Sequence, residues 1–312
     1  MGDRRDLWKL FGALISLAAV AADPAVARQP GSQTQIVLLG TGAVRADPQR
    51  SGPATAIVVN DTPYIVDAGP GIVRRAAAAF NKGVKGLAVE KLQTGFITHL
   101  HVDHTVGYPD LIFTPWVSGR NTPLRMYGPA GLEAMTKAIL VAWQADIEIQ
   151  TKGLEQRSPA GIAVDVHEIK PGAIYQDGNV KVIAFPVHHG DWPEAFGYRF
   201  ETPDRTVVIS GDTAPSPGVI DNCQRCDVLI HEAYSEEYLP PAVPNWREYR
   251  SKYHTTTTQL AEIANKAQPR LLIVYHRGVL LPGREISDEQ YLTEIQRTYH
   301  GKVVIGQDLD VY

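Results

Sequence analysis

Potential metal ligands are concentrated in one short stretch of this chain, directly after an apolar run. Three histidines and one aspartate fall within six positions, at His99, His101, Asp103 and His104. The preceding run, residues 95–97, is typical of a strand, so the ligands are expected on a loop at a strand's end. Zinc accepts imidazole nitrogens and carboxylate oxygens, and two such clusters can hold two ions. The stretch therefore predicts a metal-dependent hydrolase.

Three further apolar runs, all in the second half of the chain, also end at potential ligands. Residues 182–187 lead into His188 and His189, residues 207–210 precede Asp212, and residues 271–275 precede His276. Each run is typical of a short strand. Together with the strand before His99, they predict that four strand ends converge on one site.

The remaining chain alternates short strands with helices and contains no low-complexity linker. A hairpin is expected from residues 55–59 and 64–66, and a helix from Gly71 to Phe80. Further strands are expected at residues 36–39, 164–169, 180–185, 196–201 and 206–209, with breaks at Pro171–Gly172 and Asp177–Gly178. The pattern predicts one α+β domain over residues 33–312.

The composition of the chain says more about its possible binding partners than about its fold. A chain of 312 residues with 44% hydrophobic content can bury a large core, as one large domain or two modest ones. The net charge of −4 gives no electrostatic case for a long nucleic acid, which favours basic stripes. No nucleic-acid partner is expected.

The N-terminal segment, residues 1–27, differs from the rest. Arg4 and Arg5 precede an apolar run at residues 10–22, and residues 25–27 offer a small-x-small cleavage pattern. This is typical of an export signal and resembles the twin-arginine type, although the residue before the arginines departs from that pattern. An uncleaved anchor is disfavoured because a span needs roughly 20 apolar residues. We expect a periplasmic or secreted protein without a membrane span after signal removal.

The cysteines carry little information. There are only two, Cys223 and Cys226, so no disulfide framework holds the fold. A lone Cys-x-x-Cys lacks the second pair that a structural zinc site needs. Either a surface disulfide or two idle thiols is expected.

The order of the potential ligands matches a known family pattern. The stretch HLHVDH at residues 99–104 is followed by His189, Asp212 and His276, and GTG at 40–42 and DAGPG at 67–71 precede it. With these motifs the chain resembles the metallo-β-lactamase superfamily over nearly all of its length after the N-terminal segment. The resemblance implies an αββα sandwich, in which two sheets pack face to face beneath outer helices, with a dinuclear metal site at one edge.

The same resemblance assigns a role to each ligand. His99, His101 and His189 are expected to bind the first metal, Asp103, His104 and His276 the second, and Asp212 both. His188 is the alternative to His189, which is preferred because family members place the ligand before a glycine, here Gly190. Two zinc ions are expected, with iron or manganese as alternatives. A hydroxide that the ions generate from water is expected to attack the substrate, and Asp103 to take a proton from that water.

Three further stretches narrow the resemblance to one branch. Residues 229–234 (LIHEAY), 254–261 (HTTTTQLA) and 196–199 (FGYR) are similar to the ribonuclease Z and arylsulfatase-like branch. In that branch the residue matching His254 hydrogen-bonds the reacting anionic group or protonates the leaving group, so His254 is the second expected catalytic residue. The alternative is a structural residue next to the N-cap of a helix that begins near Thr256.

Other histidines and acidic residues are expected to have supporting or neutral roles. His231, Glu232 and Asp67 are expected to orient the ligands, or to be satisfied buried polar groups. His167 and His300 carry no motif and are expected at the surface.

Transfer-RNA processing is not expected. The transfer-RNA arm of ribonuclease Z would be inserted in the second half, where residues 147–178 leave room only for strands and turns, and export would remove the substrate. We expect instead a small-molecule ester substrate, either a phosphodiester or an aryl sulfate. Residues 108–116 and Trp192 could wall the cleft for it, with core packing as the alternative for most of them.

Other functions remain open at this stage. A lactonase or a β-lactamase would use the same fold, and so would a catalytically idle, metal-loaded binding protein. The presence of Asp103 and His254 beside a full ligand set disfavours the idle protein. A homodimer is expected only in so far as dimers are common in the family.

Overall fold

The computed structural model describes residues 33–235, 245–277 and 286–312. The export signal predicted for residues 1–27 lies outside these ranges and stays a prediction. Among the described residues, no helix combines the length and the apolar character needed to cross a bilayer.

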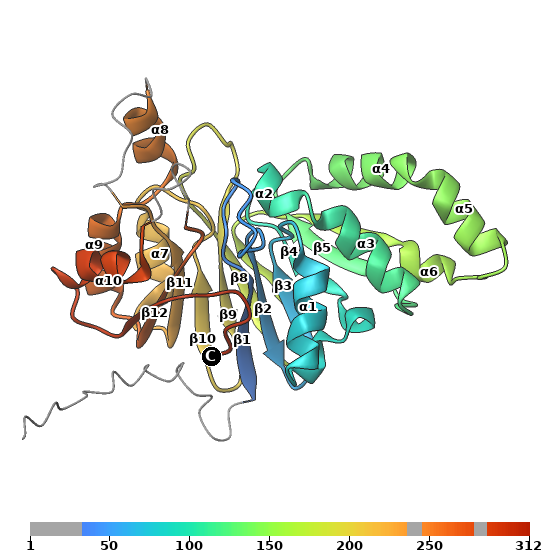
Figure 1. Ribbon diagram of the computed structural model, residues 1–312, viewed down its shortest axis with the longest axis horizontal. Helices are drawn as coiled ribbons and strands as arrows, with labels where there is room; N and C mark the ends of the chain where they lie inside the picture. The colour runs from blue at the N-terminus through green and yellow to red at the C-terminus, as the bar shows by residue number, and fades with distance from the viewer. Residues whose placement is uncertain (1–32, 236–244, 278–285) are drawn as a thin grey trace, which may run out of the picture.

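The first half of the chain forms a six-stranded sheet within the described ranges, in the order β1 to β6 (Figure 1). Its strands are β1 (Thr34–Gly40), β2 (Ala54–Val59), β3 (Thr62–Val66), β4 (Thr94–Phe96), β5 (Leu124–Gly128) and β6 (Val164–Glu168). β1 to β3 pair antiparallel, and β3 to β6 pair parallel. Asn60 and Asp61 close the predicted β2–β3 hairpin with φ of 50° and 57°, as a two-residue turn of the type I′ kind requires.

The second half forms a seven-stranded sheet of described residues, in the order β13 to β7. Its strands are β7 (Gly172–Gln176), β8 (Lys181–Pro186), β9 (Phe196–Glu201), β10 (Thr206–Ile209), β11 (Val228–Glu232), β12 (Leu271–Tyr275) and β13 (Val303–Ile305). β7 to β10 pair antiparallel, and β10 to β13 pair parallel.

The two sheets pack face to face, and alternation along their strands builds three apolar layers. Ile36 of β1 and Val207 of β10 lie in the core between the sheets, whereas their neighbours Val37 and Val208 lie in the outer cores beneath the helices. Successive side chains of a strand point to opposite faces, so a sheet buried on both faces needs an apolar residue at almost every position. The predicted αββα sandwich is confirmed.

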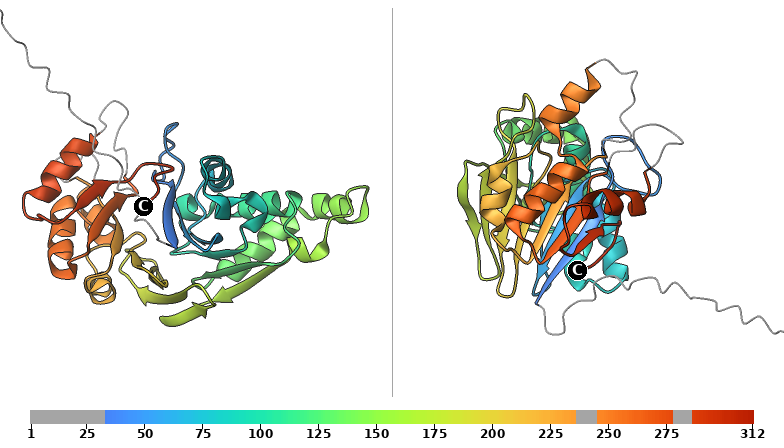
Figure 2. Two further views of the ribbon diagram at one scale, coloured as in Figure 1. Left: turned by 90° about the horizontal axis from the view of Figure 1, so that it is seen from below. Right: turned by 90° about the vertical axis from the view of Figure 1, so that its left-hand side faces the viewer.

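Helices cover both outer faces (Figures 1 and 2). The first sheet is covered by α1 (Ile72–Asn81) and α3 (Tyr108–Val117), and the second by α7 (Pro217–Cys223), α9 (Thr257–Ala267) and α10 (Asp288–Gln296). The others are α2 (Val102–Thr105), α4 (Leu132–Ala142), α5 (Gln144–Lys152), α6 (Pro159–Ile162), α8 (Trp246–Tyr253) and the 3-10 turns η1 (Lys85–Leu87) and η2 (Val89–Lys91). α4 and α5 extend away from the sheets, and α8 stands above them in Figure 1.

The expectation that residues 147–178 hold only strands and turns is wrong. Helix α5 continues to Lys152, and α6 follows at Pro159–Ile162. None of the nine residues of α5 is buried, so this helix carries no apolar stripe by which its sequence could be recognised.

Cys223 and Cys226 form a disulfide. Both sulfur-bearing side chains are buried in the outer core beneath α7 and α9, not at the surface. Of the two sequence-based alternatives, the disulfide is therefore confirmed and its surface position is wrong.

Candidate metal centre and cavity

The strand ends converge as predicted. β9 runs antiparallel to β8 and β10, and β10 to β12 run parallel, so β8, β10 and β12 all end at the same edge of the second sheet. The residues that follow these three ends are His188 and His189, Asp212, and His276. From the first sheet, β4 leads to residues 99–104, of which the last three lie in the one-turn helix α2.

One group of three imidazoles joins both sheets. The Nδ1 atom of His101 lies 3.0 Å from Nε2 of His99 and 3.0 Å from Nε2 of His189. His99 and His189 are buried, and His101 is half-buried. This is the trio that the family resemblance assigns to the first metal.

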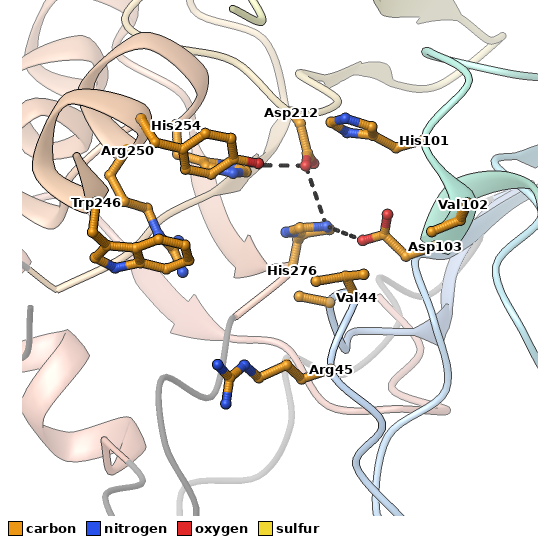
Figure 3. A pocket seen from close by; sticks show the side chains of 12 residues that line it. Val44, Arg45, His101, Val102, Asp103, Asp212, Trp246, Arg250, His254 and His276 are labelled. Atoms are coloured by element: carbon orange, nitrogen blue, oxygen red, sulfur yellow. Dashed lines mark hydrogen bonds and ion pairs between the residues drawn. The ribbon is translucent and has the colours of Figure 1, made fainter. Parts of the chain in front are cut away.

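A second group lies beside it. Nε2 of His276 is 3.2 Å from Nε2 of His104 and 3.3 Å from Oδ2 of Asp103. Asp212 directs one carboxylate oxygen to each imidazole. Its Oδ1 lies 3.4 Å from His104 Nε2. Its Oδ2 lies 3.3 Å from His276 Nε2 (Figure 3). Ligand atoms of His99, His104 and Asp212 also lie within 4.8 Å of one another, so Asp212 adjoins both groups.

This donor set fits divalent cations. A neutral imidazole carries one N–H and one lone pair, so the three nitrogens that meet at His101 can present lone pairs to a shared cation. Oδ1 of Asp212 is buried and has no hydrogen-bond partner among the described residues. Nitrogen lone pairs and a carboxylate oxygen around one centre are the ligands of zinc and related metals.

The pKa values of the histidines are shifted in opposite directions in the two groups. Burial, with the neighbouring imidazoles, lowers the pKa of His101 to about 4 and the pKa of His99 well below its usual value, which leaves lone pairs for a metal. Burial also acts to lower the pKa of His104 and His276, but Asp212, joined by Asp67 at His104 and by Asp103 at His276, outweighs burial and raises both. The same negative field attracts a metal cation, which competes with those protons.

His189, not its neighbour, faces the centre. The side chain of His188 is exposed, because successive residues after β8 alternate in direction. Gly190 follows at φ 55°, and a Cβ there would lie 1.9 Å from the ring of Tyr253. Glycine at this position lets Tyr253 pack against the loop, and the Tyr253 carbonyl accepts a hydrogen bond from Nδ1 of His189 at 2.8 Å.

Asp67 orients a ligand. Its Oδ2 accepts a hydrogen bond from Nδ1 of His104 at 2.9 Å, and its Oδ1 accepts one from the backbone N–H of Thr98 at 2.8 Å. Fixing Nδ1 as the donor leaves Nε2 of His104 free to coordinate. Asp67 itself sits at φ 64°, a conformation that aspartate tolerates better than most residues.

Glu232 supports His254 and, among the hydrogen bonds of the described residues, makes none with the candidate ligand imidazoles. Nδ1 of His254 lies 2.9 and 3.0 Å from the two Glu232 oxygens and 3.9 Å from Asp212 Oδ2. His254 ends α8, and Thr256 caps α9 with a complete capping box, so the predicted helix start is confirmed. His231 instead bonds the Glu232 carbonyl and orients no ligand.

Trp192 directly contacts the first group of imidazoles. Its indole N–H lies 2.7 Å from Nε2 of His101 and can only donate, so Nε2 must accept and the ring's proton must reside on Nδ1. Nδ1 is the atom that faces His99 and His189. If Nδ1 of His101 coordinated a metal, the ring's proton would reside on Nε2 instead. Nε2–H and the indole N–H would then be two donors facing each other, and their hydrogen bond would be lost.

Metal binding is therefore expected to displace Trp192. Adding zinc to chelator-treated protein should change the tryptophan emission, and Trp192→Phe should remove most of that change. Trp246→Phe is the matched control and should retain it. An equal change in the Trp192→Phe protein would show that His101 coordinates without disturbing the indole.

Two adjoining cavities open beside the candidate metal ligands. The first, of about 140 Å³, is lined by His101, Asp103, Asp212, His254 and His276 and by Ala43, Val44, Arg45, Val102, Trp246, Tyr249 and Arg250 (Figure 3). The second, of about 460 Å³, shares Arg45 and Asp103 with it and adds Arg50 and Arg75. None of these arginines belongs to a ligand motif, so no sequence pattern predicts their place beside the ligands.

A C-terminal residue anchors the loop that carries Arg45. Asp308 accepts hydrogen bonds from the backbone and hydroxyl of Thr41 at 2.9 and 2.8 Å and from the backbone of Ser51 at 2.7 Å. It also pairs with Arg75 at 3.3 Å. One buried carboxylate thus fixes both ends of the loop between β1 and β2.

Not every residue expected near the substrate lies there. Tyr108 and Trp116 of α3 are buried in the core beneath the first sheet and line neither cavity, so core packing is the correct alternative for them. His167 and His300 are exposed, as predicted.

Comparison with known proteins identifies relatives over most of the chain. The family described as "Beta-lactamase superfamily domain" matches residues 62–277. Ribonuclease Z of Mycobacterium avium (strain 104) is 30% identical over 280 residues, which are 88% of this chain and 96% of that protein. Among solved structures, the metallo-beta-lactamase fold protein YhfI of Bacillus subtilis has a TM-score of 0.65 at 19% identity, covering 90% of this chain and 100% of that one. The short form of human tRNase Z gives 0.65 at 22% identity, covering 89% and 98%.

These relatives contradict two sequence-based expectations, the exported small-ester hydrolase and the absence of a nucleic-acid partner. The curated relatives are ribonucleases, and the match spans 96% of the Mycobacterium avium protein, so a missing insertion is no argument against that group. The lactonase, β-lactamase and idle-protein alternatives fit these relatives no better.

Proposed function

Because this chain belongs to the β-lactamase superfamily, within its ribonuclease Z branch, we propose that it is a metal-dependent hydrolase that cleaves phosphodiester bonds in RNA. The observation that carries the proposal is the Glu232–His254 pair, which adjoins the same cavity as the ligand set. Cleavage of a phosphodiester expels a poor, alkoxide-like leaving group, and a positioned proton donor is what that step requires.

The fold implies divalent metal binding, and the proposed ligands are those assigned from the sequence. His99, His101 and His189 would hold one ion, Asp103, His104 and His276 a second, and Asp212 would bridge them. Zinc is proposed first because imidazole nitrogens predominate. When bound, the ions would polarise the phosphate and lower the pKa of a water molecule.

Asp103 is proposed to take a proton from the attacking water. Burial acts to raise the pKa of this carboxyl, but its hydrogen bond with His276 and the charge of His104 outweigh burial and lower the pKa. Asp103 is therefore ionised near neutral pH and can accept a proton, and it lines the cavity in which the phosphate would lie.

His254 is proposed to protonate the leaving oxygen. Glu232 fixes its Nδ1, so the opposite ring nitrogen, Nε2, remains available to the cavity. Glu232 also accepts a hydrogen bond from the backbone N–H of Thr213 at 3.0 Å, which links this donor to the loop that carries Asp212. The Glu232 carboxylate thus positions both His254 and the loop that carries Asp212.

The adjoining cavities favour a polyanionic substrate. Arg45 lies in both cavities, Arg250 in the first, and Arg50 and Arg75 in the second. A chain of phosphates could contact several of these guanidinium groups at once. Among the described residues Arg75 pairs with Asp308 and Arg50 with Asp47, so a small neutral ester would leave Arg45 and Arg250 without an anionic partner.

Metal removal provides the first test. Protein of known metal content is incubated with labelled RNAs that include transfer-RNA transcripts with additional nucleotides at either end. Cleavage is expected, and a chelator should lower its rate at least about a thousandfold, since the metals supply several kcal/mol of charge stabilisation. Zinc or manganese should restore the rate. Metal-loaded protein that leaves every RNA intact but hydrolyses lactones or β-lactams would reject the proposal.

A further inference from the structure

Arg250 of α8 is a buried cation that forms no ion pair with a described carboxylate. It is 9% exposed, its Nε has no hydrogen-bond partner, and no carboxylate of the described residues forms an ion pair with it. Its guanidinium lies over two aromatic rings, 4.8 Å from the Trp246 centroid and 5.1 Å from that of Tyr234. A buried charge normally requires an opposite charge, and aromatic faces offset only part of the lost hydration.

Aromatic stacking holds this part of α8 in place. The Trp246 and Tyr249 rings stack at 5.5 Å, and the Tyr249 and Tyr253 rings stack at 4.4 Å. These positions are three and four residues apart, so they share one face of the helix. The carbonyl of Tyr253 in turn bonds the metal-binding His189. Arg250 therefore sits on a wall whose position is tied to the metal centre.

The same side chain lines the first cavity. Figure 3 shows Arg250 and Trp246 on one side of this cavity and His101 and Asp103 on the other. A phosphate held by the metal-binding residues would lie across the cavity from Arg250. Contact with ring faces leaves the in-plane N–H groups of a guanidinium free, and that edge matches two oxygens of a phosphate.

We propose that Arg250 binds the RNA phosphate next to the one that is hydrolysed, and that Trp246 and Tyr234 position its guanidinium. This inference rests on the proposed RNA cleavage and adds a specificity residue to it. It predicts that Arg250 matters only for substrates with more than one phosphate.

The test compares Arg250→Met with Arg247→Met, which removes an exposed charge from the same helix. Arg250→Met should raise KM for an RNA oligonucleotide about 10- to 100-fold, the range for a charge-assisted contact, and leave kcat within about threefold. It should also reduce the slope of log(kcat/KM) against log salt by about 0.7, the value for one phosphate contact on a single strand. Methyl p-nitrophenyl phosphate, with one phosphate, should be hydrolysed at nearly the unsubstituted rate.

Arg247→Met should change none of these quantities, and Arg250→Lys should restore most of the salt slope. Equal losses on RNA and on the single-phosphate ester, or a lowered metal content, would assign Arg250 a structural role and overturn the inference. So would Arg250→Met kinetics that match those of Arg247→Met.

If the protein cuts no RNA, the proposed function is refuted, but the role of Arg250 in binding phosphate can still be measured. Fluorescence anisotropy with the intact oligonucleotide would then report binding directly. Weaker binding and a smaller salt slope in Arg250→Met than in Arg247→Met would support the phosphate contact, and identical binding would overturn it.

Discussion

Replacing Asp212 with alanine is expected to lower kcat/KM for RNA at least about a thousandfold and to release metal. Asp212 is 2% exposed and places one oxygen near His104 and the other near His276. In the proposed centre it supplies negative charge between two cations that otherwise repel each other. Its loss should therefore weaken the binding of both ions. Elemental analysis after gel filtration measures the metal that remains bound.

The matched control is Asp221→Ala, which removes an exposed carboxylate from α7. It should keep the metal content and turnover of the unsubstituted protein. Thermal melting separates a damaged fold from a damaged centre, because Asp212→Ala should lose the metal-dependent part of its stability while remaining folded. Full metal content together with normal turnover in Asp212→Ala would remove the bridging role.

Replacing His254 with alanine should reduce kcat for RNA by about 10²- to 10⁴-fold, the usual contribution of general acid catalysis, without loss of metal. The size of the loss should depend on the leaving group. An RNA hydroxyl needs a proton to depart, whereas p-nitrophenolate departs readily without one. Methyl p-nitrophenyl phosphate should therefore be hydrolysed by His254→Ala with a much smaller loss.

Glu232→Gln should show an intermediate loss with the same leaving-group dependence, since glutamine can retain a contact with His254 but not its charge. His300→Ala, an exposed imidazole, is the control and should be unchanged. Equal losses on both substrates in His254→Ala would indicate a binding or structural role and exclude proton donation.

The sequence was most informative where strands meet ligands. The strand at residues 196–201 has the predicted bounds, and the one at residues 271–275 ends directly before His276, as predicted. A strand buried on both faces must be an unbroken apolar run, so its end is marked by the first polar side chain. Because the candidate ligands directly follow such strand ends, the same pattern predicted that ligands from both halves of the chain meet at one edge of the sandwich.

Elements without a buried face escaped prediction. Helix α5 has no buried residue, and β7 at Gly172–Gln176 is an edge strand with mostly exposed side chains. Neither leaves a clear periodicity in the sequence. The roles of Glu232 and Trp192 also depend on contacts with His254 and His101, residues more than 20 positions away, and no local pattern records such contacts.

Net charge misled the expectation about nucleic acids. A value of −4 averages over the whole chain, whereas Arg45, Arg50, Arg75 and Arg250 gather at adjoining cavities only in the folded protein. Electrostatic recognition depends on local density of charge, and the Debye length at physiological ionic strength is only about 8 Å. Two of these arginines, Arg45 and Arg250, form no ion pair with a described carboxylate, so the charge at the cavities differs from the average over the chain.

The contacts of Asp308 have a consequence for folding. This carboxylate fixes Thr41 and Ser51, at the ends of the loop that carries Arg45, yet it lies 267 and 257 positions away from them along the chain. Closing so long a stretch of chain costs conformational entropy, which the loop cannot recover from local contacts alone. The wall that faces the substrate therefore takes shape only when distant segments of the fold have met.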